Sequence, residues 1–284
     1  MQIGIRLHDI NTGLAPELQT MESRMQRARE DGFSCVHLAL SKVFQEVNFD
    51  GCALTEGLAM YVKHVCRQND LDVSVLGCYL NLAHPDPRAL EKIQNRYRGY
   101  VRVAALSGAG MVGTETGAPN AEYKTDANTH SEEALEQFIR GLAPVVECAE
   151  HYGVTVAIEP VWKHIVYSAD RAIRVLNAIA SHNLRIILDP VNLLCTENLD
   201  RREAVIGNAI EKLGDRVATV HLKDYVRKGN ELQSIAAGTG EMDYTEILGF
   251  IKDRKPYLQV TLENTTNETA VGAREYLEGM YGEI

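Results

Sequence analysis

The sequence predicts an α/β chain built from eight consecutive β/α units that close into a barrel. Short apolar runs typical of strands alternate with amphipathic helical segments from one end of the chain to the other. No Gly-x-Gly-x-x-Gly motif follows the first strand, so the rival fold, an open doubly wound dinucleotide-binding sheet, loses its main support. The chain has 284 residues. Because α/β barrels reach ~250 residues as one unit, we expect residues 1–284 to form a single-domain (β/α)8 TIM barrel.

Eight segments are predicted to be strands because they are short and rich in apolar residues, as buried parallel strands are. They are Gln2–Leu7, Cys35–Leu40, Asp72–Leu80, Gly108–Thr114, Thr155–Val161, Arg185–Asp189, Val217–Lys223 and Tyr257–Glu263. Pro160 and Pro190 stand near the ends of two of these runs. Because proline cannot donate a ladder hydrogen bond, each of those two strands should end there.

Eight segments with polar and apolar residues at helical spacing are predicted to be helices. They are Pro16–Glu30, Leu54–Asn69, Pro87–Ala105, Ser131–Tyr152, Ser168–Ile179, Arg201–Leu213, Tyr244–Asp253 and Thr269–Met280. Ser131 and Ser168 suit helix N-caps, and Gly153 suits a helix stop. The longest expected loops, Thr114–His130 and Tyr225–Gly240, follow strands four and seven, and we place them at the catalytic end of the barrel.

Charge and composition disfavour several classes of protein. The formal net charge is −10 and no run of Lys and Arg stands out, which disfavours nucleic acid and anionic membranes as partners. No apolar stretch reaches the ~18 residues of a membrane helix. The six cysteines are scattered without a Cys-x-x-Cys pair, and the first strand begins at Gln2 with no leader ahead of it. We therefore expect a cytoplasmic protein with reduced thiols.

Four ligand-type residues end four consecutive strands of the second half: Glu159, Asp189, His221 and Glu263. Alternate side chains on a strand face the same way, so each of these can point into the mouth of the barrel. Buried there, each would be a costly charge or an unpaired dipole, and a divalent cation removes that cost. Three carboxylates and one imidazole suit Mn²⁺, Mg²⁺ or Co²⁺, and Zn²⁺ stays open. Helix caps or ion pairs are the alternative for each residue taken singly.

These motifs, "AIEP", "LDPVN", "VHLKD" and "TLEN", resemble the xylose-isomerase-like barrel superfamily of sugar isomerases and epimerases, in particular the single-metal ketose 3-epimerases. The resemblance implies that Glu159, Asp189, His221 and Glu263 hold one metal ion. It also matches Arg227 to a family arginine, and Gly238-Thr239-Gly240 with Asp243 to a downstream glycine pair. Two positions depart from the pattern. Asn192 replaces a histidine and Ile165, beside His164, replaces a substrate-binding glutamate.

The resemblance implies proton transfer at a carbon next to a carbonyl, through an enediolate, with Glu159 and Glu263 as base and acid. Return of the proton to the same carbon makes an epimerase, and return to the neighbouring carbon makes an aldose–ketose isomerase. The expected partner is a small sugar or sugar phosphate, and a homo-oligomer stays open. The alternatives are an inosose-type dehydratase on the same metal site and a non-catalytic sugar-binding barrel. An endonuclease-IV-like nuclease is disfavoured, because Asn192 stands where that family needs a histidine ligand.

Seven further residues are candidates for substrate binding, each with a structural alternative. Lys223 lies two residues beyond His221 on the same strand face, or it forms a surface ion pair with Asp224. Trp162 offers a stacking surface, or it is part of the core wall. The other candidates are loop or strand-end residues that could equally be ordinary loop residues: Arg227, His8, Glu115, Asn192 and His84.

Overall fold

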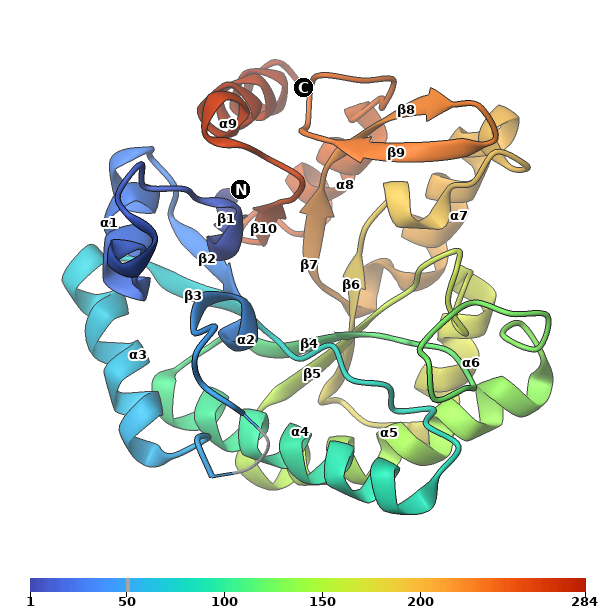
Figure 1. The fold of residues 1–284 in the computed structure, drawn as a ribbon. Helices are drawn as coiled ribbons and strands as arrows, with labels where there is room; N and C mark the ends of the chain where they lie inside the picture. The colour runs from blue at the N-terminus through green and yellow to red at the C-terminus, as the bar shows by residue number, and fades with distance from the viewer. Residues whose placement is uncertain (50–51) are drawn as a thin grey trace.

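Eight parallel strands form a closed barrel in the computed structural model, which describes residues 1–49 and 52–284 (Figure 1). The barrel strands are β1 (Gln2–Arg6), β2 (Cys35–Leu38), β3 (Asp72–Gly77), β4 (Met111–Glu115), β5 (Thr155–Glu159), β6 (Leu184–Leu188), β7 (Val217–Leu222) and β10 (Gln259–Leu262). They follow one another around the barrel in chain order, and β10 closes the ring by pairing with both β7 and β1. The predicted TIM-barrel fold is confirmed.

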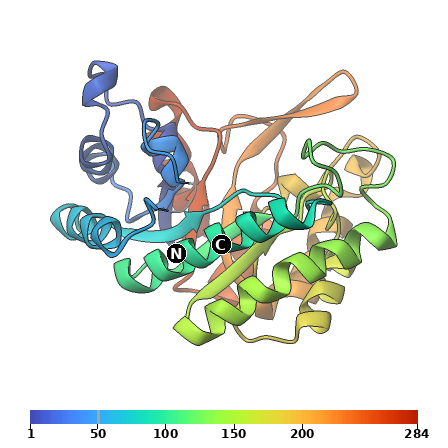
Figure 2. The ribbon, with the colours of Figure 1, turned by 60° about the horizontal axis from the view of Figure 1, so that its bottom comes forward.

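Helices surround the strands and cover the outside of the barrel, with α4 and α5 side by side along one flank (Figure 2). The helices are α1 (Met21–Glu30), α2 (Leu40–Val43), α3 (Glu56–Asn69), α4 (Pro87–Ser107), α5 (Glu132–Tyr152), α6 (Ala169–Ile179), α7 (Arg202–Leu213), α8 (Thr245–Arg254) and α9 (Asn267–Glu283). Short 3-10 helices cover Leu7–Asp9, Pro16–Leu18, Val191–Leu193, Leu199–Arg201 and Gly214–Arg216. Across the described residues, the helices lack the combination of length and hydropathy that a bilayer crossing requires.

The predicted helix ends agree with the local chemistry. Ser131 Oγ accepts a hydrogen bond from the backbone N–H of Ala134, 3.1 Å away, and this caps α5. Gly153 ends the same helix with φ of +67°, a left-handed conformation that costs glycine no steric strain. Ser168 caps α6 in the same way as Ser131 caps α5. Polar side chains at these ends satisfy backbone groups that the helices leave unpaired.

Several predicted boundaries are wrong. The segment Pro16–Glu30 is a 3-10 turn followed by a separate helix that begins after Thr20, whose hydroxyl caps it. The predicted strands Cys35–Leu40 and Asp72–Leu80 are too long, since β2 ends at Leu38 and β3 at Gly77. Apolar residues continue past both strands because Ala39 and Leu40 after β2 and Cys78 after β3 are also buried. The run Gly108–Thr114 begins too early, since Gly108 is the left-handed cap of α4.

The second predicted long loop contains an antiparallel hairpin, β8 (Asp224–Lys228) and β9 (Glu231–Ile235). Its two strands pair from Asp224 opposite Ile235 to Lys228 opposite Glu231, and the turn between them contains Gly229 at φ of +64°. The hairpin lies beyond the end of β7 and projects from the rim of the barrel (Figures 1 and 2). The sequence suggests a loop here because most of these residues are polar, and away from Asp224 and Tyr225 the hairpin is exposed or only partly covered.

The barrel interior is packed with side chains. Val75, Met111, Ala157 and Ile187 form one apolar cluster inside the ring. Ala157 and Ile187 precede Glu159 and Asp189 by two residues, so these acidic side chains share the inward-facing side of their strands. The interior therefore presents a floor of apolar side chains beneath the polar residues at the strand ends.

A buried tyrosine of α4 fixes the loop that follows β3. The Tyr97 hydroxyl lies 2.6 Å from Cys78 O and 2.6 Å from Thr114 Oγ1. Helix α5 also packs against this loop, at Gly141. A Cβ atom on Gly141 would lie 1.8 Å from the carbonyl oxygen of Leu82, a distance that real structures do not show. The loop is thus held by contacts that leave no space at Gly141.

We expect the substitution Gly141→Ala to lower the free energy of unfolding by about 1–3 kcal/mol, because the added methyl group overlaps backbone that cannot move freely. The matched control is Gly249→Ala in α8, where a Cβ atom meets nothing within 4 Å. That variant should gain up to about 1 kcal/mol from helix propensity. Urea unfolding followed by circular dichroism measures both, and equal stabilities would contradict the tight packing of α5 on the loop.

Candidate metal centre

The four strand-end residues lie together at the carboxyl ends of neighbouring barrel strands. Glu159 is the last residue of β5, His221 lies in β7, and Asp189 and Glu263 directly follow β6 and β10. All four are buried, with exposed fractions of 2% for Glu159, 0% for Asp189 and His221, and 6% for Glu263. The sequence places them in one ring because each ends an inward-facing alternation on its own strand. The structure brings the four side chains together at the barrel mouth.

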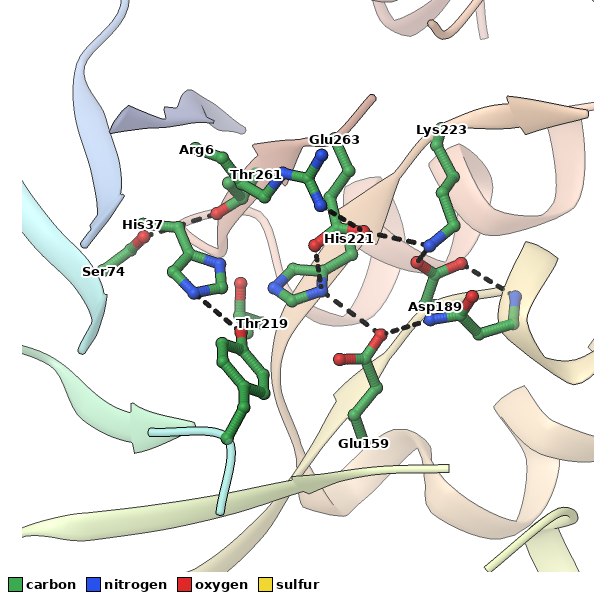
Figure 3. A network of polar contacts seen from close by, with 12 residues as sticks. Arg6, His37, Ser74, Glu159, Asp189, Thr219, His221, Lys223, Thr261 and Glu263 are labelled. Atoms are coloured by element: carbon green, nitrogen blue, oxygen red, sulfur yellow. Dashed lines mark hydrogen bonds and ion pairs between the residues drawn. The ribbon is translucent and has the colours of Figure 1, made fainter. Parts of the chain in front are cut away.

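The imidazole of His221 is the centre of this group. Its Nδ1 atom lies 3.3 Å from Glu159 Oε1 and 3.2 Å from Glu263 Oε1, and the two carboxylates reach it from two sides (Figure 3). Donor atoms of Glu159, Asp189 and His221 all lie within 4.8 Å of one another. Four ligands at about 2.1 Å from an ion would lie about 3.4 Å apart in a tetrahedral site. The donor types suit a divalent cation, and three of the four predicted ligands already lie together in one such group.

Lys223 reaches into the same group from β7's carboxyl end. Its ammonium lies 2.8 Å from Asp189 Oδ2 and 2.9 Å from Glu263 Oε2, and the residue is 5% exposed (Figure 3). The prediction that it shares a face with His221 agrees with this placement, whereas the alternative of a surface ion pair with Asp224 is wrong. A buried ammonium of this kind balances part of the carboxylate charge.

The pKa values of the site follow from burial and from mutual charge. Burial opposes the charged form of His221, but Glu263 and Glu159 outweigh it and raise the pKa of the imidazole to about 9. Burial also raises the pKa of Asp189, to about 6, although Lys223 acts against it. Lys223 and His221 overcome the burial of Glu263 and hold its pKa well below the usual range. The described side chains thus carry both signs of charge in one buried cluster.

The neighbouring Asp224 has a different task. Its Oδ2 atom accepts hydrogen bonds from the backbone N–H groups of Gly238 and Gly240, at 3.1 and 2.9 Å. Its Oδ1 atom accepts from the N–H of Met242, at 2.8 Å. A Cβ atom on Gly240 would lie 2.2 Å from the carbonyl oxygen of Tyr225, so glycine is required there. The glycine pair noted in the sequence therefore encloses a carboxylate of the chain itself.

A cavity of about 390 Å³ opens above the cluster, and it is lined by four of the seven supporting candidates: His8, Glu115, Asn192 and Lys223. Asn192 holds two of the acidic side chains. Its backbone N–H donates to Asp189 Oδ1 at 3.0 Å, and its side-chain Nδ2 donates to Glu159 Oε1 at 2.7 Å. Asn192, which replaces a histidine of the family pattern, thus orients two carboxylates.

Glu115 ends β4 and lies beside Glu159, with which it is paired in register. Burial, followed by the charge of Glu159, raises the pKa of Glu115 to about 7. His164 Nδ1 lies 3.8 Å from Glu115 Oε2, and burial lowers the pKa of His164 to about 4. The cavity wall therefore holds a carboxyl group whose pKa is raised to about 7.

The other three supporting candidates lie outside this cavity's lining. Trp162 lines a neighbouring cavity. Arg227 is exposed on the hairpin, where its backbone N–H donates to Glu241 Oε1 at 3.3 Å. His84 lies in the turn before α4, and its Nδ1 accepts from the backbone N–H of Asp86 at 3.1 Å.

Sequence reasoning overlooked three residues of the site: Arg6, His37 and Tyr79. The fully buried His37 ring stacks on His221 with 5.3 Å between centroids, and its Nε2 lies 2.7 Å from the Tyr79 hydroxyl. His37, His221 and Glu263 also bring donor atoms within 4.8 Å of one another. Arg6 Nη1 lies 3.7 Å from Glu263 Oε2. The one sequence signal was that Arg6 and His37 interrupt apolar strands, whereas their position opposite each other in register is seen only in the structure.

Comparison with known proteins gives a family and a set of similar folds. The family described as "Xylose isomerase-like TIM barrel" matches residues 25–280. No curated protein sequence matches the chain. Among solved structures, a D-tagatose 3-epimerase-like protein has a TM-score of 0.77 at 17% identity, covering 100% of this chain and 97% of the other.

Two further structures have the same fold. The IOLI protein, solved with a bound zinc atom, has a TM-score of 0.71 at 15% identity, and the match covers 100% and 99% of the two chains. The probable 3-DHS dehydratase from Bacillus anthracis has a TM-score of 0.70 at 15% identity, covering 99% and 98%. At these identities the structural matches establish the shared fold.

We expect Lys223→Met to destabilise the metal-free protein by about 3–5 kcal/mol, because Asp189 and Glu263 would lose a buried counter-charge. Added Mn²⁺ should raise the melting temperature of this variant more than that of the unaltered protein. Thermal unfolding after chelation, with and without Mn²⁺, measures both effects. Lys42→Met is the control, since Lys42 lines the same cavity but is exposed. A variant as stable as the unaltered protein would show that the ammonium is not a needed counter-charge.

Proposed function

The chain belongs to the xylose isomerase-like TIM barrel family, and from that premise we propose that it is a divalent-metal-dependent sugar isomerase or epimerase. The single observation that carries this proposal is the pair of buried glutamates, Glu159 and Glu263, on two sides of His221 Nδ1. An acid and a base on two sides of one binding point are what a proton transfer with inversion or relocation requires. The similarity to epimerase folds agrees with this reaction class.

We propose that Glu159, Asp189, His221 and Glu263 hold the ion, which is one of Mn²⁺, Co²⁺, Mg²⁺ or Zn²⁺. When bound, such an ion supplies a positive charge that stabilises an enediolate of the sugar. Glu159 removes the proton next to the carbonyl, and Glu263 returns one from the other side. Asn192 orients Glu159 for this task through the 2.7 Å hydrogen bond to its Oε1 atom.

The cavity above the cluster is the proposed sugar site. Arg6, His8 and Lys223 offer N–H donors on one part of its wall, and Glu115 offers a carboxyl group on another. Hydroxyl groups can donate to and accept from such a lining, which suits a small sugar or a sugar phosphate. The six cysteines are free, which favours a reducing, cytoplasmic setting for this carbohydrate chemistry.

A dehydratase on the same site is the second candidate, and Glu115 is the observation that favours it. A carboxyl group with a pKa near 7 can donate a proton to a leaving hydroxyl group. The barrel of a probable dehydratase is also similar in fold. Both reactions begin by removal of a proton next to a carbonyl, so the residues around His221 serve either one.

We expect Glu159→Gln and Glu263→Gln each to lower the rate of deuterium incorporation from D₂O into a ketose substrate by about 10²–10⁴ or more, because each removes one proton-transferring group. Mass spectrometry of the sugar, with Mn²⁺, Co²⁺ or Mg²⁺ present, measures the exchange. Glu246→Gln, an exposed residue of α8, is the control and should exchange like the unaltered protein. Normal exchange by both site variants would remove the acid–base assignment.

Product analysis separates the two candidate reactions. An isomerase or epimerase gives a sugar of unchanged mass in H₂O, whereas a dehydratase gives a product lighter by one water that absorbs in the ultraviolet. We expect unchanged mass for the preferred substrate. Loss of water from that substrate, abolished by Glu115→Gln but restored by Glu115→Asp, would favour the dehydratase instead.

A further inference from the structure

A second cavity, of about 310 Å³, lies beside the proposed sugar site and under the hairpin. Its walls come from three places: the segment after β5, the segment after β6 and the hairpin β8–β9. The hairpin contributes Asn230, Glu231, Leu232 and Ser234. Without this hairpin, which the sequence alone did not reveal, one side of the cavity would be open.

This hairpin cavity adjoins the cavity above the proposed metal ligands and shares part of its lining. Val161, Lys163, Asn192 and Ser234 line both of them. Asn192 also donates to Glu159, so the boundary between the two spaces lies next to a proposed catalytic carboxylate. A molecule bound at the cluster and long enough to pass these shared residues would therefore contact the hairpin cavity as well.

The lining of the hairpin cavity combines apolar and hydrogen-bonding groups. Trp162, Leu194 and Leu232 supply apolar surface, while Thr196 and Asn230 supply hydroxyl and amide groups. Sugar rings have the same combination of apolar C–H faces and a hydroxyl rim. A site of ~300 Å³ or more with a few polar groups is typical of small-molecule binding.

The charged residues that line the hairpin cavity disfavour a negatively charged ligand there. Two carboxylates, Glu197 and Glu231, line the hairpin cavity, and Lys163 is the cation of its lining. A phosphate or carboxylate group placed there would meet more negative than positive charge. A neutral group with hydroxyls can instead donate to the carboxylates.

The segments that form the walls are held in place before any ligand binds. The backbone N–H of Trp162 donates to Asn192 O at 2.7 Å and joins the segments after β5 and β6. Asn198 fixes the second segment, since its Oδ1 accepts from Cys195 N and its Nδ2 donates to Leu193 O, each at 2.9 Å. Preformed walls of this kind favour binding because little ordering is required.

We propose that the substrate is a glycoside-type sugar: a reacting ring at the metal centre that carries a second, neutral, hydroxyl-bearing ring in the hairpin cavity. This inference rests on the proposed function and narrows its substrate class. The second ring supplies binding energy away from the reacting carbon, and its fit to the hairpin separates such substrates from free ketoses and from sugar phosphates.

The test compares deuterium incorporation from D₂O into two sets of compounds. One set holds the free ketoses fructose and tagatose and their phosphates, and the other holds the ketodisaccharides turanose, lactulose and isomaltulose. The full chain is used with Mn²⁺. We expect kcat/KM for at least one ketodisaccharide to exceed that of every free or phosphorylated ketose by about tenfold or more.

The variant Leu232→Trp fills the hairpin cavity from β9. We expect it to lower kcat/KM for the ketodisaccharide about tenfold or more, mainly through KM, and to change the free-ketose value less than about twofold. Gln233→Trp is the matched control, because Gln233 is the next residue of β9, is exposed and lies outside the lining. Should Leu232→Trp fail to fold, Asn230→Ala removes one polar contact and should show the same split.

The outcomes are distinguishable. Exchange with free ketoses that is equal to or faster than exchange with all three ketodisaccharides overturns the glycoside inference and leaves the proposed function in place. An equal loss for both substrate sets in Leu232→Trp also overturns it. Exchange with none of the compounds by a folded, Mn²⁺-loaded protein counts against the proposed function itself, and the inference fails with it.

Discussion

Concentrated negative charge inside a low-dielectric barrel is the constraint on which the rest of this structure depends. Glu159, Asp189 and Glu263 are nearly inaccessible to water and lie around one imidazole. Carboxylates in such a place are unstable unless a cation faces them. The ammonium of Lys223 and the guanidinium of Arg6 meet part of this need. The divalent ion proposed above, held by donor atoms around His221, would meet the remainder. The stability of the barrel and the chemistry of the site therefore both depend on how these buried carboxylates are neutralised.

The alternation of side chains along the chain brings positive charge to these carboxylates. In the run His221-Leu222-Lys223-Asp224, His221 and Lys223 reach the carboxylate cluster, whereas Leu222 joins the hydrophobic core. Asp224 binds the glycine turn instead. The adjacent residues Lys223 and Asp224, which carry opposite charges, thus bind different parts of the protein: the carboxylate cluster and the glycine turn. A one-residue shift of this strand would exchange their positions and lose both.

The sequence predicted the barrel and the convergence of the four strand ends because both follow from short-range alternation along each strand. It missed His37 and Arg6 because a single polar residue in an apolar strand has no local pattern that marks its partner. The hairpin was missed for a different reason. Its residues Asp224–Ile235 are mostly polar and half-exposed, so no apolar alternation distinguishes them from a loop. Those contacts depend on which strands become neighbours, and that is a property of the closed ring.

The hydrogen bonds of Asp224 limit which parts of the protein a change in the hairpin can affect. Its carboxylate fastens the foot of the hairpin to the glycine turn through main-chain amides, which makes the attachment insensitive to the side chains farther out. A change in length or composition at the tip, around Gly229, therefore leaves the carboxylate cluster at the end of β7 undisturbed. Such a change would alter the lining of the hairpin cavity, to which Asn230 and Glu231 belong, and leave His221 in place.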